Sequence, residues 1–151
     1  MVEEVIIVCD LSGSMLECGK RFILRTALQT VQQYFMMQNP NVNLRLVRWS
    51  CDFSECEWPR TAYPEELMRC EGKASVQALV DKLPEWEGVP KIILTDGCWQ
   101  DDARCFDAWT QSTARNDLRL VLLGADSRIP SKTIETYSSE SILSALEGLG
   151  D

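Results

Sequence analysis

The chain has 151 residues, a size typical of one domain with a single core, and we expect residues 1–151 to form one domain. Its net charge of −8 argues against nucleic acid as a partner, and the complete absence of histidine excludes Ser-His-Asp and Cys-His catalysis. No apolar stretch approaches the about 20 residues that span a bilayer, and the acidic N-terminus is unlike a secretory signal. We therefore expect a cytoplasmic protein without a membrane partner.

In the first half of the chain, strand and helix patterns alternate. An apolar run predicts a strand at 4–9, and apolar residues at helical spacing predict a helix at 20–38, which Asn39-Pro40 ends. A second strand pattern follows at 43–50. The short charged segment at 53–58 is interpreted as an antiparallel edge strand.

The second half continues the alternation. Helix patterns at 76–83, at 101–114 and after Ser139, the expected N-cap, alternate with apolar strands at 91–95 and 118–123. Nearly continuous apolar strands between helices are typical of a parallel sheet covered on both faces. The sequence therefore predicts an α/β fold with a doubly wound, Rossmann-like, mostly parallel sheet, one antiparallel edge strand and helices on both faces.

The seven cysteines do not form a regular metal-binding or disulfide pattern. Their spacing is irregular and contains no Cys-x-x-Cys pair, which favours reduced thiols that serve mostly as small buried hydrophobic residues. A zinc site at Cys51, Cys56 and Cys70 is the alternative, although no histidine could complete it. The seven are Cys9, Cys18, Cys51, Cys56, Cys70, Cys98 and Cys105.

Two motifs follow apolar strands and carry oxygen ligands. The first is Asp10-Leu11-Ser12-Gly13-Ser14, after the strand at 4–9, and the second is Leu94-Thr95-Asp96-Gly97, at the end of the strand at 91–95. In open sheets of this class, ligands bind beyond the carboxyl ends of the strands, where the strand order reverses. If the two strands are neighbours, Asp10 and Asp96 converge on one point, and carboxylates with serine hydroxyls suit a hard cation such as Mg²⁺.

The first motif resembles the metal-ion-dependent adhesion site (MIDAS) of von Willebrand factor A (VWA) domains, which reads Asp-x-Ser-x-Ser. The resemblance extends over the chain in element order. It implies a noncatalytic protein-interaction module whose metal ligands are Asp10, Ser12, Ser14 and Asp96. It also implies Mg²⁺, Mn²⁺ or Ca²⁺, held either by the free protein or only in the partner-bound state. The implied partner is a protein whose acidic side chain completes the coordination. Intracellular relatives suggest as partner a MoxR-type AAA ATPase or a bacterial stress or defence assembly.

The second ligand loop departs from the family pattern. Family members usually offer a threonine there, whereas the equivalent stretch, Glu71-Gly72-Lys73-Ala74-Ser75, has none. The Ser75 hydroxyl could substitute as a ligand, or the Lys73 ammonium could compete with the ion. Beside this candidate site, we expect a partner to contact Met15, Lys73 and Trp99.

Two alternatives remain open at the sequence level. Val8-Cys9-Asp10-Leu11-Ser12 is also similar to the nucleophile strand of haloacid-dehalogenase-like phosphotransferases, in which Asp10 would attack phosphorus with the help of Mg²⁺. Those enzymes usually place a second aspartate where this chain has Ser12. The other alternative is a VWA scaffold that has lost its metal.

Overall fold

The computed structural model describes residues 2–58, 63–99, 104, 106–107, 117–130 and 134–150. All five predicted strands are present in the described part of the chain, within two residues of the expected boundaries. They are β1 (Glu4–Asp10), β2 (Asn43–Trp49), β3 (Phe53–Cys56), β4 (Lys91–Thr95) and β5 (Leu118–Leu122). A further strand, β6 (Thr136–Ser138), was not predicted, because its three residues form no apolar run.

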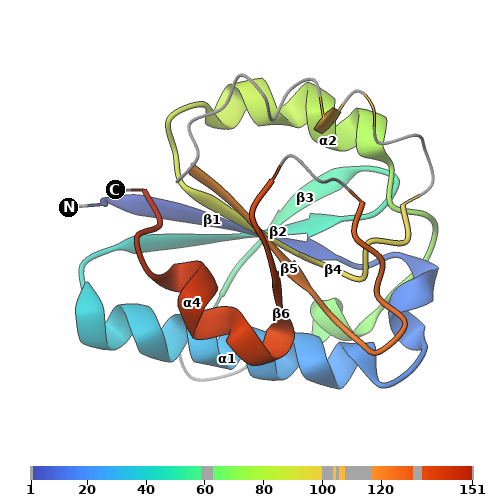
Figure 1. The fold of residues 1–151 in the computed structure, drawn as a ribbon, viewed down its shortest axis with the longest axis horizontal. Coiled ribbons are helices and arrows are strands. Elements are labelled where there is room, and N and C mark those ends of the chain that lie inside the picture. The colour runs from blue at the N-terminus through green and yellow to red at the C-terminus, as the bar shows by residue number, and fades with distance from the viewer. Residues whose placement is uncertain are drawn as a thin grey trace.

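The strands form one sheet in the order β3-β2-β1-β4-β5-β6 (Figure 1). Strand β3 pairs antiparallel with β2 at one edge, and all other neighbours are parallel. From β1 the chain adds β2 and then β3 on one side, and it then crosses to the other side of β1 to form β4, β5 and β6. The predicted doubly wound sheet with an antiparallel edge strand is therefore confirmed.

Helices cover both faces of this sheet. The long helix α1 (Lys20–Gln38) and the short α4 (Ile142–Leu146) lie on one face, and α2 (Val76–Lys82) lies on the other (Figure 1). Ser139 does not cap α4 as expected, because it begins a 3-10 turn that precedes that helix. Most of the helix predicted at 101–114 lies outside the described residues.

The side chains of β1 show how the core is divided. Val5, Ile7 and Cys9 pack on the side of α1, whereas Ile6 and Val8 pack on the side of α2, and none of the five is more than 1% exposed. Side chains alternate along a strand, so a strand buried on both faces must be apolar at every position. This explains the continuous apolar run that predicted β1.

The polar residues that follow β1 and β4 come to one edge of the sheet. The two strands are parallel neighbours, with Cys9 paired to Leu94, so Asp10 and Asp96 leave the sheet side by side. This is the point at which the strand order reverses, the usual ligand position in such sheets.

Within the described ranges, no helix has the combination of length and apolarity needed to cross a membrane.

Candidate metal-binding site

Three loops meet at this edge and are joined by backbone contacts. The amide of Gly13 in the first loop donates to the carbonyl oxygen of Gly72 in the second loop, at 2.8 Å. Ala74, also in the second loop, forms an isolated bridge with Trp99 in the third loop. The three segments singled out in the sequence thus form one continuous rim.

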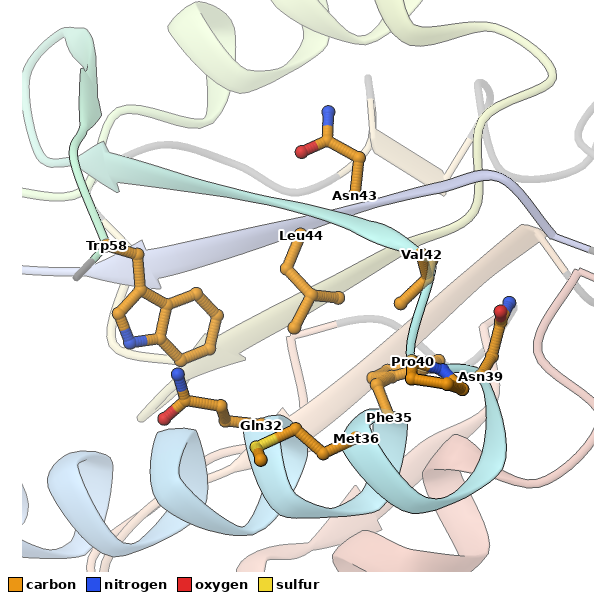
Figure 2. A pocket seen from close by; sticks show the side chains of 9 residues that line it. All are labelled: Gln32, Phe35, Met36, Asn39, Pro40, Val42, Asn43, Leu44 and Trp58. Atoms are coloured by element: carbon orange, nitrogen blue, oxygen red, sulfur yellow. The ribbon is translucent and has the colours of Figure 1, made fainter. Parts of the chain in front are cut away.

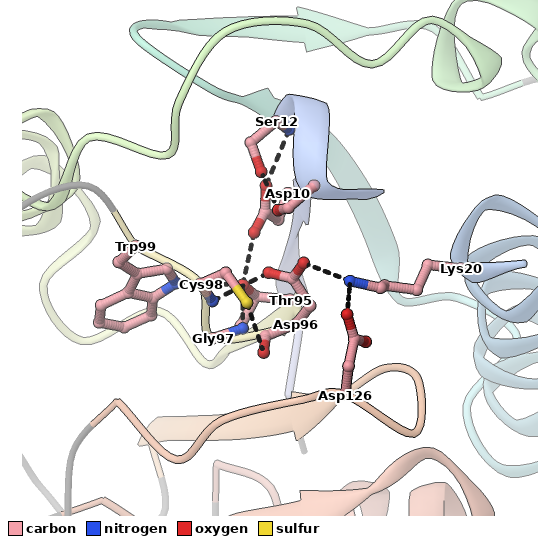
Figure 3. A network of polar contacts seen from close by, with 10 residues as sticks. Asp10, Ser12, Lys20, Thr95, Asp96, Gly97, Cys98, Trp99 and Asp126 are labelled. Carbon is pink, nitrogen blue, oxygen red and sulfur yellow. Dashed lines mark hydrogen bonds and ion pairs between the residues drawn. The ribbon is translucent and has the colours of Figure 1, made fainter. Parts of the chain in front are cut away.

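The first loop folds back over Asp10 (Figure 3). The Ser12 amide donates to Asp10 Oδ1 at 2.9 Å, and the hydroxyl oxygens of Ser12 and Ser14 lie 3.1 Å apart. Asp10 and Ser12 are buried, whereas Ser14 is half-buried. The structure therefore brings Asp10, Ser12 and Ser14 together, with Ser14 as the partly exposed member, and their role as metal ligands stays a prediction.

Thr95 joins the first and third loops, a role that the sequence analysis did not identify. Its Oγ1 donates to Asp10 Oδ2 at 2.6 Å and accepts from the Gly97 amide at 3.1 Å and from Trp99 Nε1 at 3.0 Å. The available signal was a threonine at the last position of a buried strand, directly before Asp96. A fully buried hydroxyl needs such partners.

Asp96 is held by a buried lysine. Lys20 Nζ lies 2.8 Å from Asp96 Oδ2 and 2.9 Å from Asp126 Oδ2, and the Lys20 side chain is fully buried (Figure 3). The Cys98 amide donates to Asp96 Oδ1 at 3.0 Å. Neither Lys20 nor Asp126 was predicted as a site residue. Lys20 had a signal, because it lies one helical turn before Leu24 on the apolar stripe of α1.

The two central carboxylates differ in electrostatic environment. Burial raises the pKa of Asp10 to about 6, despite the hydrogen bonds from Ser12 and Thr95 that favour its ionised form. Burial also acts to raise the pKa of Asp96, but hydrogen bonds from Lys20, Ser14 and the Cys98 amide outweigh it and hold that pKa below its usual value. Among the described residues, Asp10 has no cationic partner in an ion pair.

The hydroxyl and carboxylate oxygens at this edge are suitable ligands for a small divalent cation. Mg²⁺ takes about six oxygens at about 2.0–2.1 Å, so adjacent ligands of an octahedron lie about 2.8–3.0 Å apart. The 3.1 Å between the Ser12 and Ser14 hydroxyl oxygens is close to this separation. The described residues contain no cluster of three or more His, Cys, Asp or Glu side chains that could hold a metal. A cation here would therefore depend on hydroxyls together with the carboxylates of Asp10 and Asp96.

The remaining predicted site residues take other places. Ser75 Oγ accepts from the Ala78 amide at 3.2 Å and caps α2, while Lys73 lies exposed in the second loop. Met15 is fully buried in the α1-side core, so it offers no surface to a partner, contrary to its interpretation as a contact.

Trp99 is only half-buried, but most of its contacts are internal. Its ring packs edge-on against Trp49 and Phe106, at centroid distances of 5.4 and 5.0 Å. Together with the hydrogen bond to Thr95, these contacts fix the third loop. Trp99 thus supports the site from within as well as bordering it.

A separate hollow lies at the opposite end of β2 (Figure 2). It has a volume of about 180 Å³ and is formed between the C-terminal half of α1 and the segment around Val42, with Phe35, Met36 and Trp58 in its wall. It contains none of the residues that meet at the carboxyl edge. The length of the strands separates it from the candidate metal ligands, because Val42 to Leu44 lie at the start of β2 and Asp10 at the end of β1.

Similarity to known proteins is found in the structure and not in the sequence. No family model matches the sequence, and no curated protein matches it. Many solved structures match the fold, several of them over nearly the whole chain. An aerotolerance-related membrane protein from Bacteroides fragilis has a TM-score of 0.62 and 11% identity, covering 99% of this chain and 98% of its own. The VWA domain of SpRpn10 has a TM-score of 0.61 and 9% identity, covering 100% and 98%.

The chain has the von Willebrand A fold. Manganese-loaded TRAP protein from Plasmodium vivax is similar too, with a TM-score of 0.66 and 12% identity, covering 98% of this chain and 73% of that protein. At these identities the likeness establishes the fold, and the function of this VWA-like chain has to be argued from its own residues.

Proposed function

We propose that this chain is a noncatalytic protein-interaction module that binds a partner protein through a divalent cation held by Asp10, Ser12, Ser14 and Asp96. The observation that carries the proposal is the environment of Asp10. Its carboxylate is fully buried, lies beside a pair of hydroxyls 3.1 Å apart, and has no cationic partner among the described residues. A buried charge without a counter-ion is costly, and an external cation at this place would compensate it.

The local charge balance supports a divalent ion. Asp10, Asp96 and Asp126 contribute three negative charges and Lys20 one positive charge, which leaves two negative charges when all four groups are ionised. The hydroxyls of Ser12 and Ser14 are neutral ligands. Mg²⁺, Mn²⁺ and Ca²⁺ are the candidates, and the similar TRAP structure is loaded with manganese.

A groove beside the cluster supports a protein as the partner. It has a volume of about 610 Å³, includes Leu11 and Gly72 from the first two loops, and contains both Arg48 and Arg69. Arg48 already pairs with Glu66 at 3.2 Å, so the groove carries charges of both signs. An acidic partner side chain could reach the cation while neighbouring residues of the partner meet the arginines. A MoxR-type AAA ATPase as partner and a cytoplasmic location stay predictions.

The phosphotransferase alternative has less support. A nucleophilic carboxylate needs an open path to phosphorus, whereas Asp10 is fully buried and both its oxygens accept hydrogen bonds. Ser12 also stands where such enzymes place their second aspartate. The remaining alternative is a VWA scaffold that binds no metal, and the metal-binding experiments below distinguish it from the proposed function.

The first test is direct binding of Mn²⁺ to the purified protein, followed by electron paramagnetic resonance of the free ion. We expect saturable binding that Asp10→Ala and Ser12→Ala abolish. Asp81→Ala, which removes an exposed carboxylate on α2, is the matched control and should leave binding unchanged. Equal binding by the wild type and by Asp10→Ala would contradict the proposed ligand set, and no binding by the wild type would favour the metal-free scaffold for the free protein.

The second test asks whether the bound ion accepts an external carboxylate. Mn²⁺ with coordinated water accelerates the relaxation of water protons, and acetate that displaces this water should reduce the effect. We expect acetate to reduce relaxation in the wild-type complex at constant Mn²⁺ occupancy. An unchanged relaxation rate at saturating acetate would argue against a partner carboxylate as the missing ligand.

A further inference from the structure

We propose that Lys20 is a built-in cation of this site, which holds Asp96 when no divalent ion is bound and lowers the affinity of the site for such an ion. The inference rests on the proposed metal site and concerns its regulation. Lys20 would set a threshold, so that the free protein holds the ion weakly and the added carboxylate of a partner makes binding tight.

The contacts of Lys20 are those of a counter-ion. Its ammonium donates to Asp96 Oδ2 at 2.8 Å and to Asp126 Oδ2 at 2.9 Å. The Lys20 and Asp96 side chains are fully buried, whereas that of Asp126 is 39% exposed. A buried charge is screened by solvent much less than an exposed one, so the Lys20 ammonium still acts on the neighbouring cluster.

The surrounding backbone makes room for this lysine. Gly124, in the loop after β5, has a φ of +92°, and a Cβ added there would lie 2.9 Å from Lys20 Cγ and 3.1 Å from Lys20 Cδ. The alkyl chain of Lys20 therefore packs where any other residue at 124 would place its side chain. Two segments more than 100 residues apart in the sequence, at Lys20 and at Gly124 to Asp126, together place the ammonium against Asp96.

This placement has a direct consequence for a metal ion. A cation bound by Asp10 and the serine hydroxyls would lie near an ammonium of the same sign, and it would share Asp96 with that ammonium. Repulsion between the two positive charges weakens metal binding. Conversely, the lysine compensates the Asp96 charge when the ion is absent, so the edge of the sheet keeps its structure without metal.

The test compares the Mn²⁺ affinity of the wild type with that of Lys20→Met and of the double variant Lys20→Met/Asp126→Asn. We expect both variants to bind Mn²⁺ about tenfold more tightly or better, because a like charge at contact distance from a ligand is removed. The double variant keeps the net charge of the cluster at two negative charges, as in the wild type. It therefore separates the occupation of Asp96 by Lys20 from a general charge effect, and it remains informative if Lys20→Met does not fold.

Lys91→Met is the matched control. Lys91 is also buried, at 1% exposure, but it begins β4, so about 16 Å of strand separate it from Asp96. Its removal should leave Mn²⁺ affinity unchanged. In thermal unfolding, Mn²⁺ should raise the melting temperature of the Lys20 variants more than that of the wild type or of Lys91→Met.

The outcomes distinguish this inference from the proposed function. Equal or weaker Mn²⁺ binding by the folded Lys20 variants, with binding by the wild type, would overturn the role of Lys20 and leave the metal site standing. Binding by the Lys20 variants alone would support the role of Lys20, while showing that the free wild-type protein holds no ion. No binding by any folded variant would overturn both.

Discussion

At the scale of single residues, one hydroxyl organises much of the site. Thr95 Oγ1 donates to Asp10, which joins the two aspartate loops, and it accepts from Gly97 and Trp99 within the third loop. The neighbouring Gly97 fixes the same loop, because at its φ of +76° an added Cβ would lie 1.7 Å from the Arg128 carbonyl oxygen. The third loop therefore tolerates little change at either position.

Replacing Thr95 by Val should be costly, whereas replacing it by Ser should not. Thr95→Val leaves buried partners unsatisfied, and we expect it to lower the free energy of unfolding by about 1–3 kcal/mol. We also expect weaker Mn²⁺ binding, because Asp10 loses the donor that orients Oδ2. Thr95→Ser keeps the hydroxyl and is the control. Urea unfolding measures the stability, and equal midpoints for the Val and Ser variants would show that these bonds contribute little.

At the scale of elements, the start of α2 separates a capping role from a ligand role. The Ser75 hydroxyl accepts from the Ala78 amide, three residues into the helix, which is the usual N-cap arrangement. The Ser75 backbone is also fixed, because its amide donates to the Ser50 carbonyl oxygen at 2.9 Å. The sequence suggested Ser75 as a substitute ligand, and its hydroxyl is already engaged in capping this helix.

Ser75→Ala therefore tests which role dominates. Loss of the cap should lower the free energy of unfolding by about 1 kcal/mol. Mn²⁺ affinity should change by less than about twofold, since a change in binding free energy of only a few tenths of a kcal/mol corresponds to that ratio. Ser75→Asp, which can also cap a helix, should recover the stability. A large loss of Mn²⁺ affinity in Ser75→Ala would instead identify Ser75 as a ligand.

At the scale of the whole molecule, the buried and half-buried cysteines make the stability depend on pH. The six cysteines in the described residues are free thiols, but only Cys9 and Cys70 are buried, fewer than the sequence predicted. Burial raises the pKa of Cys56 to about 12, with Glu66 acting in the same direction, and burial raises the pKa of Cys9 well above its ordinary value. Burial also raises the pKa of Cys70.

We expect the protein to lose stability at alkaline pH. In the unfolded chain these thiols release their protons near pH 9, whereas in the folded protein they retain them, so the free energy of unfolding falls as pH rises from about 9 toward 12. Below pH 9 the buried thiols are protonated in both states, so their contribution to the free energy of unfolding is fully present. Urea midpoints at pH 7.5 and pH 10 measure the effect, which Cys56→Ser should reduce and exposed Cys51→Ser should not. Equal midpoints at the two pH values for the wild type would contradict the expectation.

Local patterns were sufficient for most of the fold. The helix 20–38 and the strand 91–95 were predicted with the bounds that the structure shows, because burial of one helix face or of a whole strand leaves a repeated apolar signal. Strand β6 was missed because its three residues at a sheet edge, two half-buried and one exposed, leave no such signal. Met15 was misread as a surface contact, because a methionine beside a polar motif does not reveal which side of the chain it faces.

The sequence by itself determined the alternation of elements, the parallel sheet and the two motifs that place Asp10 and Asp96 at its carboxyl edge. These features follow from hydrophobic periodicity and from short segments that remain continuous along the chain. Only the tertiary structure decided how these carboxylates are compensated. Thr95 is 85 residues from Asp10 in the sequence, and Lys20 is 76 residues from Asp96 and 106 from Asp126. A side chain's electrostatic environment depends on which groups the fold brings within hydrogen-bonding distance.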